Sequence, residues 1–145
     1  MIGMLVTIAH QQTFHNNFNT LQMKNRTSYN FKKMKMDDKT YALRRKVINV
    51  IYELKNHVQL PRIEVRIVEN GDENICGYAY LGANIVHINK KYCNLKKDEL
   101  FHLIAHEVVH AVTGFRHDND CYLMHPHIKY KPNKDKSLEA FKKYF

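Results

Sequence analysis

The chain has 145 residues, of which 44% are hydrophobic and 26% are charged. This composition is typical of one folded domain, and no stretch approaches the roughly 18 consecutive apolar residues of a membrane span. Three cysteines, Cys76, Cys93 and Cys121, form no CxxC pair, and the first ten residues lack the basic start of a signal peptide. We therefore expect free thiols, no membrane partner and a cytoplasmic location.

The net charge of +9 is concentrated at the two ends of the chain. Residues 1–36 carry five basic and no acidic residues, residues 128–145 carry six lysines and two acidic residues, and residues 37–127 carry 12 of each. Basic ends attract phosphate backbones, so they predict contacts with DNA, although solubilising tails would have the same composition. We expect a loosely ordered basic extension over 1–36, with Met23, Met34 and Met36 as alternative starts, a folded domain over 37–127 and a basic tail over 128–145.

Hydrophobic spacing along the central region predicts a helix followed by three strands and a second helix. The first helix is capped by Asp37 or Asp38, places an apolar residue at every third or fourth position, and ends before Pro61. Alternating or apolar runs bounded by turn residues predict the strands. The predicted ranges are 37–58 for the first helix, 63–67, 75–81 and 85–88 for the strands, turns at 70–71 and 82–84, and 138–144 for a short helix in the tail.

The second predicted helix contains an HExxH motif formed by His106, Glu107 and His110. Asn94 or Asp98 can cap this helix, and it ends near residue 113. Residues four apart lie on one helix face, so the two imidazoles can bind one metal ion with Glu107 beside them as a general base. The elements together predict an α+β fold, in which the N-terminal helix and a small mixed or antiparallel sheet pack on the helix that carries HExxH.

A third histidine follows the helix and completes the predicted metal site. Gly114 ends the helix and lets the chain turn back, which brings His117 toward the other two histidines. Three protein ligands and one water are typical of a catalytic zinc site. Other residues could serve as the third or a fourth ligand, and these are His125, His127, Cys121 and Glu139.

These motifs resemble those of the zincin metallopeptidases. The motif with Gly114 and His117, followed by Met124, is similar to the HExxHxxGxxH sequence and Met-turn of metzincins, with one extra residue between His110 and Gly114. Residues 40–118 resemble the SprT-like (Spartan-type) branch, in which a hairpin precedes the metal helix. The resemblance implies a zinc endopeptidase with one Zn²⁺ held by the three histidines, Glu107 as general base and Met124 beneath the metal. Its substrates would be polypeptides, including proteins bound to DNA.

The resemblance also implies that an extended substrate pairs with an exposed strand edge. The candidate edge is 77–81, with Gly77, Tyr78 and Ala79 as the substrate-strand residues, because small side chains keep the surface open. The same small residues would equally allow close helix packing. Four tyrosines are candidates to stabilise the oxyanion, namely Tyr78, Tyr80, Tyr122 and Tyr130.

Two other functions stay open at this point. A three-histidine, metal-dependent ribonuclease of the YbeY type would use HxxxHxxxxxH without a need for Glu107, although the spacing from His110 to His117 is one residue too long. A non-catalytic nucleic-acid-binding module, in which the metal only stabilises the fold, would account for the basic ends.

Overall fold

The computed structural model describes residues 5–10, 37–69, 75–92, 94–128 and 131–145. Its elements follow in the order β1 (Leu5–His10), α2 (Asp38–Lys55), β2 (Glu64–Val68), β3 (Ile75–Tyr80), β4 (Ile85–Asn89), a 3₁₀ turn (Lys90–Tyr92), α3 (Lys97–Thr113) and α4 (Lys134–Lys142). The predicted α+β class is confirmed. Among the described residues, no helix has the length and apolar character needed to cross a membrane.

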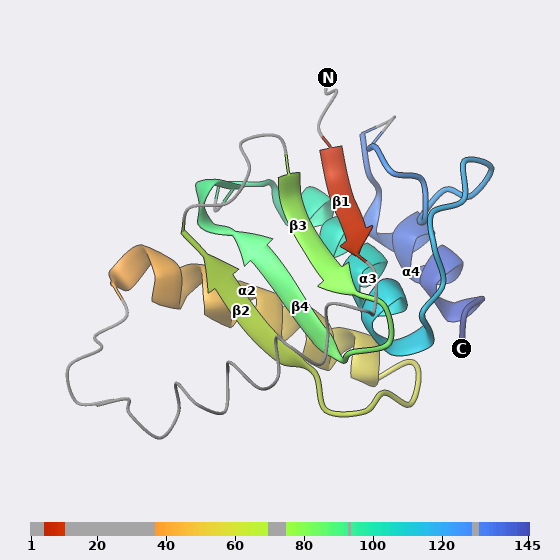
Figure 1. Cartoon of the computed structure of the whole chain (residues 1–145), viewed down its shortest axis with the longest axis horizontal. Coiled ribbons are helices and arrows are strands. Elements are labelled where there is room, and N and C mark those ends of the chain that lie inside the picture. The colour runs from red at the N-terminus through yellow and green to blue at the C-terminus, as the bar shows by residue number, and fades with distance from the viewer. Residues whose placement is uncertain (1–4, 11–36, 70–74, 93, 129–130) are drawn as a thin grey trace.

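The four strands form one mixed sheet in the order β1-β3-β4-β2. β2 pairs with β4 in parallel, β3 pairs with β4 antiparallel, and β1 pairs with β3 in parallel. Helices α2 and α3 lie against the same face of this sheet, and α4 packs beside α3 (Figure 1). The core lies between the sheet and the helices and is built from side chains such as Leu43, Leu54, Val86, Phe101 and Ile104.

Helix α2 forms for the reasons that the sequence suggests. The side chain of Asp37 caps it by accepting a hydrogen bond of 2.9 Å from the backbone N–H of Thr40. Its buried residues follow a spacing of three or four, which places them on the face toward the sheet and α3. These residues are Thr40, Leu43, Val47, Ile51 and Leu54.

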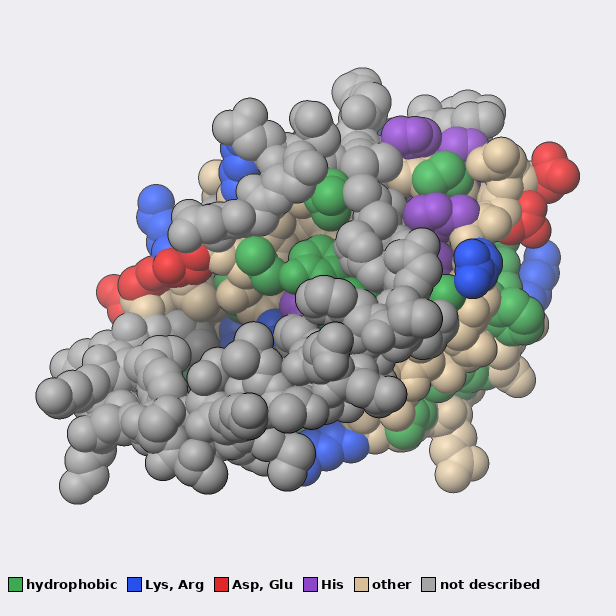
Figure 2. Space-filling view, in the orientation of Figure 1, with side chains coloured by type: hydrophobic (Ala, Val, Ile, Leu, Met, Phe, Trp, Pro, Cys, Tyr) green, Lys and Arg blue, Asp and Glu red, His purple; other side chains and the backbone are tan. Residues whose placement is uncertain are grey.

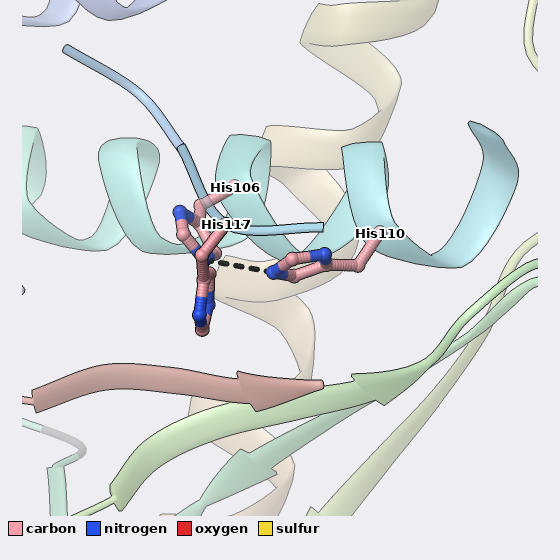
Figure 3. A group of neighbouring side chains, drawn as sticks. All are labelled: His106, His110 and His117. Carbon is pink, nitrogen blue, oxygen red and sulfur yellow. Dashed lines mark hydrogen bonds between the residues drawn. The ribbon is translucent and has the colours of Figure 1, made fainter. Parts of the chain in front are cut away.

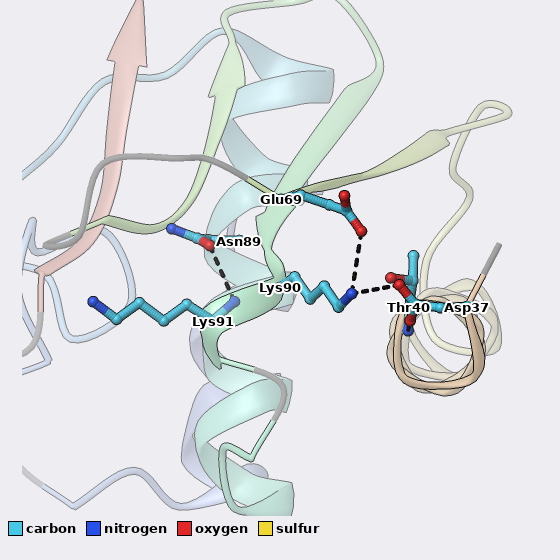
Figure 4. Close-up of polar contacts among 6 residues, drawn as sticks. All are labelled: Asp37, Thr40, Glu69, Asn89, Lys90 and Lys91. Atoms are coloured by element: carbon cyan, nitrogen blue, oxygen red, sulfur yellow. Dashed lines mark hydrogen bonds and ion pairs between the residues drawn. The ribbon is translucent and has the colours of Figure 1, made fainter.

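A lysine at the end of β4 joins three elements (Figure 4). The Nζ of Lys90 contacts the carboxylate of Asp37 at the start of α2 and, at 3.1 Å, that of Glu69 just after β2. The hydrogen bond from Lys90 holds the pKa of the Asp37 carboxyl well below its usual value. Asn89 accepts a hydrogen bond from the backbone of Lys91 at 3.1 Å and so fixes the turn in which Lys90 lies. These contacts link the start of α2 to the sheet.

Helix α3 crosses the centre of the molecule, and every residue from Leu100 to Ala111 is buried. The predicted caps Asn94 and Asp98 are wrong. The helix begins after Lys96, whose backbone N–H donates to the Glu99 carboxylate at 3.0 Å, because a glutamate in the first turn can supply the missing acceptor. The predicted stop is confirmed, since Gly114 adopts the left-handed conformation with φ of 76°.

Two elements differ from the sequence expectation. The strand β1 was not predicted, and it lies within the segment 1–36 that was expected to be loosely ordered. The predicted turn at 70–71 and the rest of that segment lie outside the described residues. Helix α4 begins at Lys134 rather than at residue 138, because the side chain of Asn133 caps it by accepting from the backbone N–H of Lys136 at 3.1 Å.

The prediction that residues 77–81 form an exposed strand edge is wrong. β3 lies between β1 and β4, so both of its edges are paired, and β1 is the outer strand (Figure 1). Close packing explains why position 77 holds a glycine. A Cβ atom there would lie 2.9 Å from the carbonyl oxygen of His87 and 3.5 Å from Cδ1 of Leu103. Gly77 thus allows β3 to approach its neighbours closely.

Candidate metal centre

Three histidines converge beside α3, as the sequence predicts. His106 and His110 lie one turn apart on α3, and His117 comes from the segment that returns after Gly114 (Figure 3). One ring nitrogen from each lies within 4.8 Å of the others, which is close enough for all three to hold a single metal ion. His106 and His110 are fully buried and His117 is partly buried. Histidine side chains gather on one side of the face drawn in Figure 2.

Backbone carbonyls set the orientation of two of the rings. Nδ1 of His106 lies 2.6 Å from the carbonyl oxygen of Leu123, and Nδ1 of His110 lies 2.6 Å from that of Phe115. A carbonyl oxygen can only accept, so each Nδ1 carries the proton and donates it. In a neutral imidazole the opposite nitrogen, Nε2, then offers a lone pair. Both rings therefore present an unprotonated Nε2 to the centre of the cluster.

These lone pairs form a suitable site for a cation, because two lone pairs that face each other repel unless a positive charge lies between them. The Nε2 atoms of His106 and His110 are 3.1 Å apart, the contact drawn as a dashed line in Figure 3. The buried Nε2 of His117 has no hydrogen-bond partner among the residues that the structure describes. Burial lowers the pKa of His106 well below its usual value, lowers that of His110 to about 4 and also lowers that of His117. A proton is thus disfavoured at neutral pH, whereas a divalent metal ion binds neutral imidazole, and the residues fit such an ion.

Glu107, the predicted general base, is completely buried on α3 next to His106. Its carboxylate is not part of the group of three ligand atoms, and its role as a general base stays a prediction. The buried thiol of Cys76 on β3 lies near enough to be affected by it: burial, together with the Glu107 charge, raises the pKa of Cys76 to about 12. Cys76 is therefore held as a neutral thiol and is a poor ligand or nucleophile.

Two of the alternative ligands, His125 and Cys121, make hydrogen bonds to other groups. Nδ1 of His125 accepts a hydrogen bond of 3.1 Å from the backbone of His127, and Sγ of Cys121 lies 3.0 Å from the hydroxyl of Tyr144. In the part of the chain that the structure describes, the only group of three or more metal-binding side chains is that of His106, His110 and His117. Cys121, His125, His127 and Glu139 lie outside it.

The segment after His117 folds back so that its carbonyls reach the site. The backbone N–H of Asp118 donates to the carbonyl of Met124 at 2.9 Å, which closes the loop and places Leu123 against His106. Met124 is fully buried next to Leu123. Its role beneath the metal stays a prediction. A cavity of about 290 Å³ opens along this loop, and its lining includes Tyr122, His125 and His127 but none of the three clustered histidines.

Three of the candidate oxyanion residues contact side chains or backbone groups outside the cluster. Tyr78 stacks on His87 at a ring distance of 4.2 Å, and Tyr80 packs edge-on against the same ring. The hydroxyl of Tyr122 accepts from the backbone of Asn133 at 3.0 Å. Tyr130 lies outside the described residues.

Sequence reasoning missed the groups that hold the ligands. The carbonyls of Leu123 and Phe115 carry no residue-type signal, because any residue supplies a carbonyl. His102, one turn before His106, is also buried, and its Nδ1 lies 2.8 Å from Oγ of Ser137 on α4. This contact joins α3 to α4, and the spacing of His102 from His106 already indicated a place on the same helix face.

Comparisons of the chain with protein-family models, with curated proteins and with solved structures give no match. The resemblance to zincins therefore depends on the motif residues alone, and the site is interpreted from its own chemistry.

Proposed function

We propose that this chain is a zinc-dependent metallopeptidase that hydrolyses peptide bonds. His106, His110 and His117 would be the ligands of one Zn²⁺, and Glu107 would be the general base. The observation that carries the proposal is the pair of inward-facing Nε2 atoms at 3.1 Å, each fixed by a carbonyl bound to its Nδ1. Three neutral imidazoles are a ligand set well suited to zinc, and hydrogen bonds to the second ring nitrogen are typical of zinc-bound histidines.

An incomplete ligand set favours catalysis over a structural role. Structural zinc sites close with four protein ligands, whereas catalytic sites use three and leave a position for water. Three are gathered among the described residues. When bound, the ion would acidify a water molecule and polarise the carbonyl of the substrate.

The protein's own contribution would then be proton transfer and orientation. The carboxylate of Glu107 would take a proton from the attacking water and deliver it to the nitrogen of the leaving amine. The carbonyls of Leu123 and Phe115 would keep the His106 and His110 rings from rotating, since each holds an Nδ1 proton. Polypeptides would be the substrates, including proteins bound to DNA.

The test is cleavage of an unstructured protein such as casein by the zinc-loaded chain, compared with Glu107→Gln and with Glu139→Gln. Glu139 is exposed on α4, so its substitution controls for the loss of one carboxylate. We expect Glu107→Gln to keep one zinc per chain and to lose about 10²- to 10⁴-fold in rate, and Glu139→Gln to match the parent. A zinc-loaded parent that cleaves no polypeptide would overturn the proposal. Cleavage of single-stranded RNA by that parent would favour the ribonuclease.

A further inference from the structure

A second surface with its own chemistry lies on α2, on elements that do not carry the metal site. A groove of about 210 Å³ runs between this helix and the segment that leads into β2. Its apolar part is formed by Ile48, Ile51, Ile63 and Val65, and the remaining lining residues are Arg44, Tyr52, Lys55 and Arg62. The groove thus combines an apolar surface with three cations and an aromatic ring.

The cations of this groove are not neutralised by the acidic residues nearby. Glu53 of α2 pairs with Lys134 of α4, and Glu64 of β2 pairs with Arg66. No acidic side chain lines the groove, and among the described residues no ion pair involves Arg44, Lys55 or Arg62. Residues 37–127 carry equal numbers of basic and acidic residues, but the fold gathers positive charge at this groove because the nearby acidic residues pair with other cations.

Exposed tyrosines accompany these cations. The side chains of Tyr41 and Tyr52 are 54% and 61% exposed, which is unusual for rings of this size. The guanidinium of Arg45 lies 5.9 Å from the Tyr41 ring centre, and Nζ of Lys55 lies 5.6 Å from that of Tyr52. Eleven residues correspond to about three helical turns, so the two tyrosines lie on the same side of α2, about 16 Å apart.

We propose that this face of α2 binds single-stranded nucleic acid. Phosphates would contact Arg44, Lys55 and Arg62, and bases would stack on Tyr52 and on Tyr41 farther along the helix. Flat rings next to unpaired cations favour a ligand with both phosphates and exposed bases, whereas a duplex hides the faces of its bases. This inference is independent of the proposed peptidase activity, and it assigns the nucleic-acid contact to the folded centre and not to the basic ends.

Fluorescence anisotropy of a labelled single-stranded thymidine 15-mer with the full chain, over a series of salt concentrations, tests the proposal. We expect Arg44→Ala with Arg62→Ala to weaken binding and to reduce the salt slope, log Kd against log salt, by about 1.4, because each phosphate contact contributes about 0.7. Tyr52→Ala should weaken binding about five- to hundredfold, and Tyr52→Phe should bind as the parent does. Lys97→Ala with Lys143→Ala removes two exposed charges elsewhere and should leave the slope unchanged.

Several results would overturn the inference. These are no binding by the parent at low salt, an equal loss in the Lys97/Lys143 control, equally tight binding of the matching duplex, and equal competition by poly-glutamate. The last result would indicate an acidic polypeptide as the ligand. Thermal unfolding followed by circular dichroism confirms that each variant is folded, which we expect because Tyr52 and Arg62 are exposed.

Discussion

At the scale of single residues, the site depends on which nitrogen of each ring carries the proton. The carbonyls of Leu123 and Phe115 bind Nδ1 of His106 and His110, so the lone pairs of Nε2 face each other. His117 supplies a third buried Nε2. Burial lowers the pKa of His117, and the nearby His125 and His127 lower it further. Neither belongs to the cluster, and Nδ1 of His125 accepts a hydrogen bond from the backbone N–H of His127.

His117→Ala should therefore weaken zinc binding strongly, and His125→Ala should leave it nearly unchanged. Loss of a direct ligand should exceed the roughly 10- to 100-fold effect of losing an outer partner. Competition for zinc against a chromogenic chelator measures both variants. Equal affinities for the two variants would show that His117 is not the third ligand.

The residue types of the site were predictable from the sequence, but their supports were not. The spacing of His106 and His110 determines that both side chains project from one helix face. The contacts from Leu123 and Phe115 depend on how the loop after Gly114 closes, and backbone carbonyls leave no trace in a sequence. The groove on α2 was equally hidden, because counting charges along the chain does not show that Glu53 and Glu64 pair with Lys134 and Arg66.

At the scale of elements, the turn after α3 positions the third ligand. Gly114 has φ of 76°, and a Cβ atom there would meet nothing within 4 Å. The position therefore favours glycine because of its left-handed backbone conformation and not because space is lacking. The N–H of Gly114 donates to the carbonyl of His110 at 3.1 Å and ends the helix. The next residue, Phe115, supplies the carbonyl for His110, which couples this turn to the site.

Gly114→Ala should cost about 1 kcal/mol of unfolding free energy and should also weaken zinc binding, since the left-handed conformation disfavours a Cβ. Gly114→Asn should cost less in both measurements, because asparagine tolerates this conformation. Urea denaturation and zinc titration of the two variants provide the comparison. An alanine variant as stable as the asparagine variant would contradict this explanation of the turn.

The helices and the three strands β2, β3 and β4 follow from local patterns, whereas β1 does not. The partner of β1 lies about 70 residues further along the chain, with Leu5 opposite Ile75. Such a pairing depends on contacts between distant segments and not on local spacing. The edge predicted for 77–81 was wrong for the same reason, since a sequence does not show which strand covers another.

At the scale of the whole molecule, α4 closes the structure against α3. Phe141 is fully buried, and Ser137 contacts the buried ring of His102, whose edge packs on Tyr122. Burial lowers the pKa of His102 to about 4. The ring is therefore neutral in the folded protein at pH values where the unfolded chain would take up a proton.

This difference predicts a loss of stability in acid. Between the unfolded pKa of about 6.5 and the folded pKa of about 4, the unfolded state binds more protons, so the free energy of unfolding falls as the pH is lowered. The contribution of His102 is at most about 1.4 kcal/mol per pH unit. Urea denaturation of the parent and of His102→Gln at pH 7 and pH 5, both with chelator, should give a smaller pH effect in the variant. An equal effect in both would assign the acid sensitivity to other groups.

The most direct test of the metal centre is X-ray absorption spectroscopy of the full chain loaded with one equivalent of zinc. The structure predicts three imidazole nitrogens and one oxygen at about 2.0–2.1 Å, with no sulfur. That result would establish a three-histidine site with a position for water. A sulfur ligand at about 2.3 Å, or four imidazoles, would show a closed structural site and contradict the catalytic account.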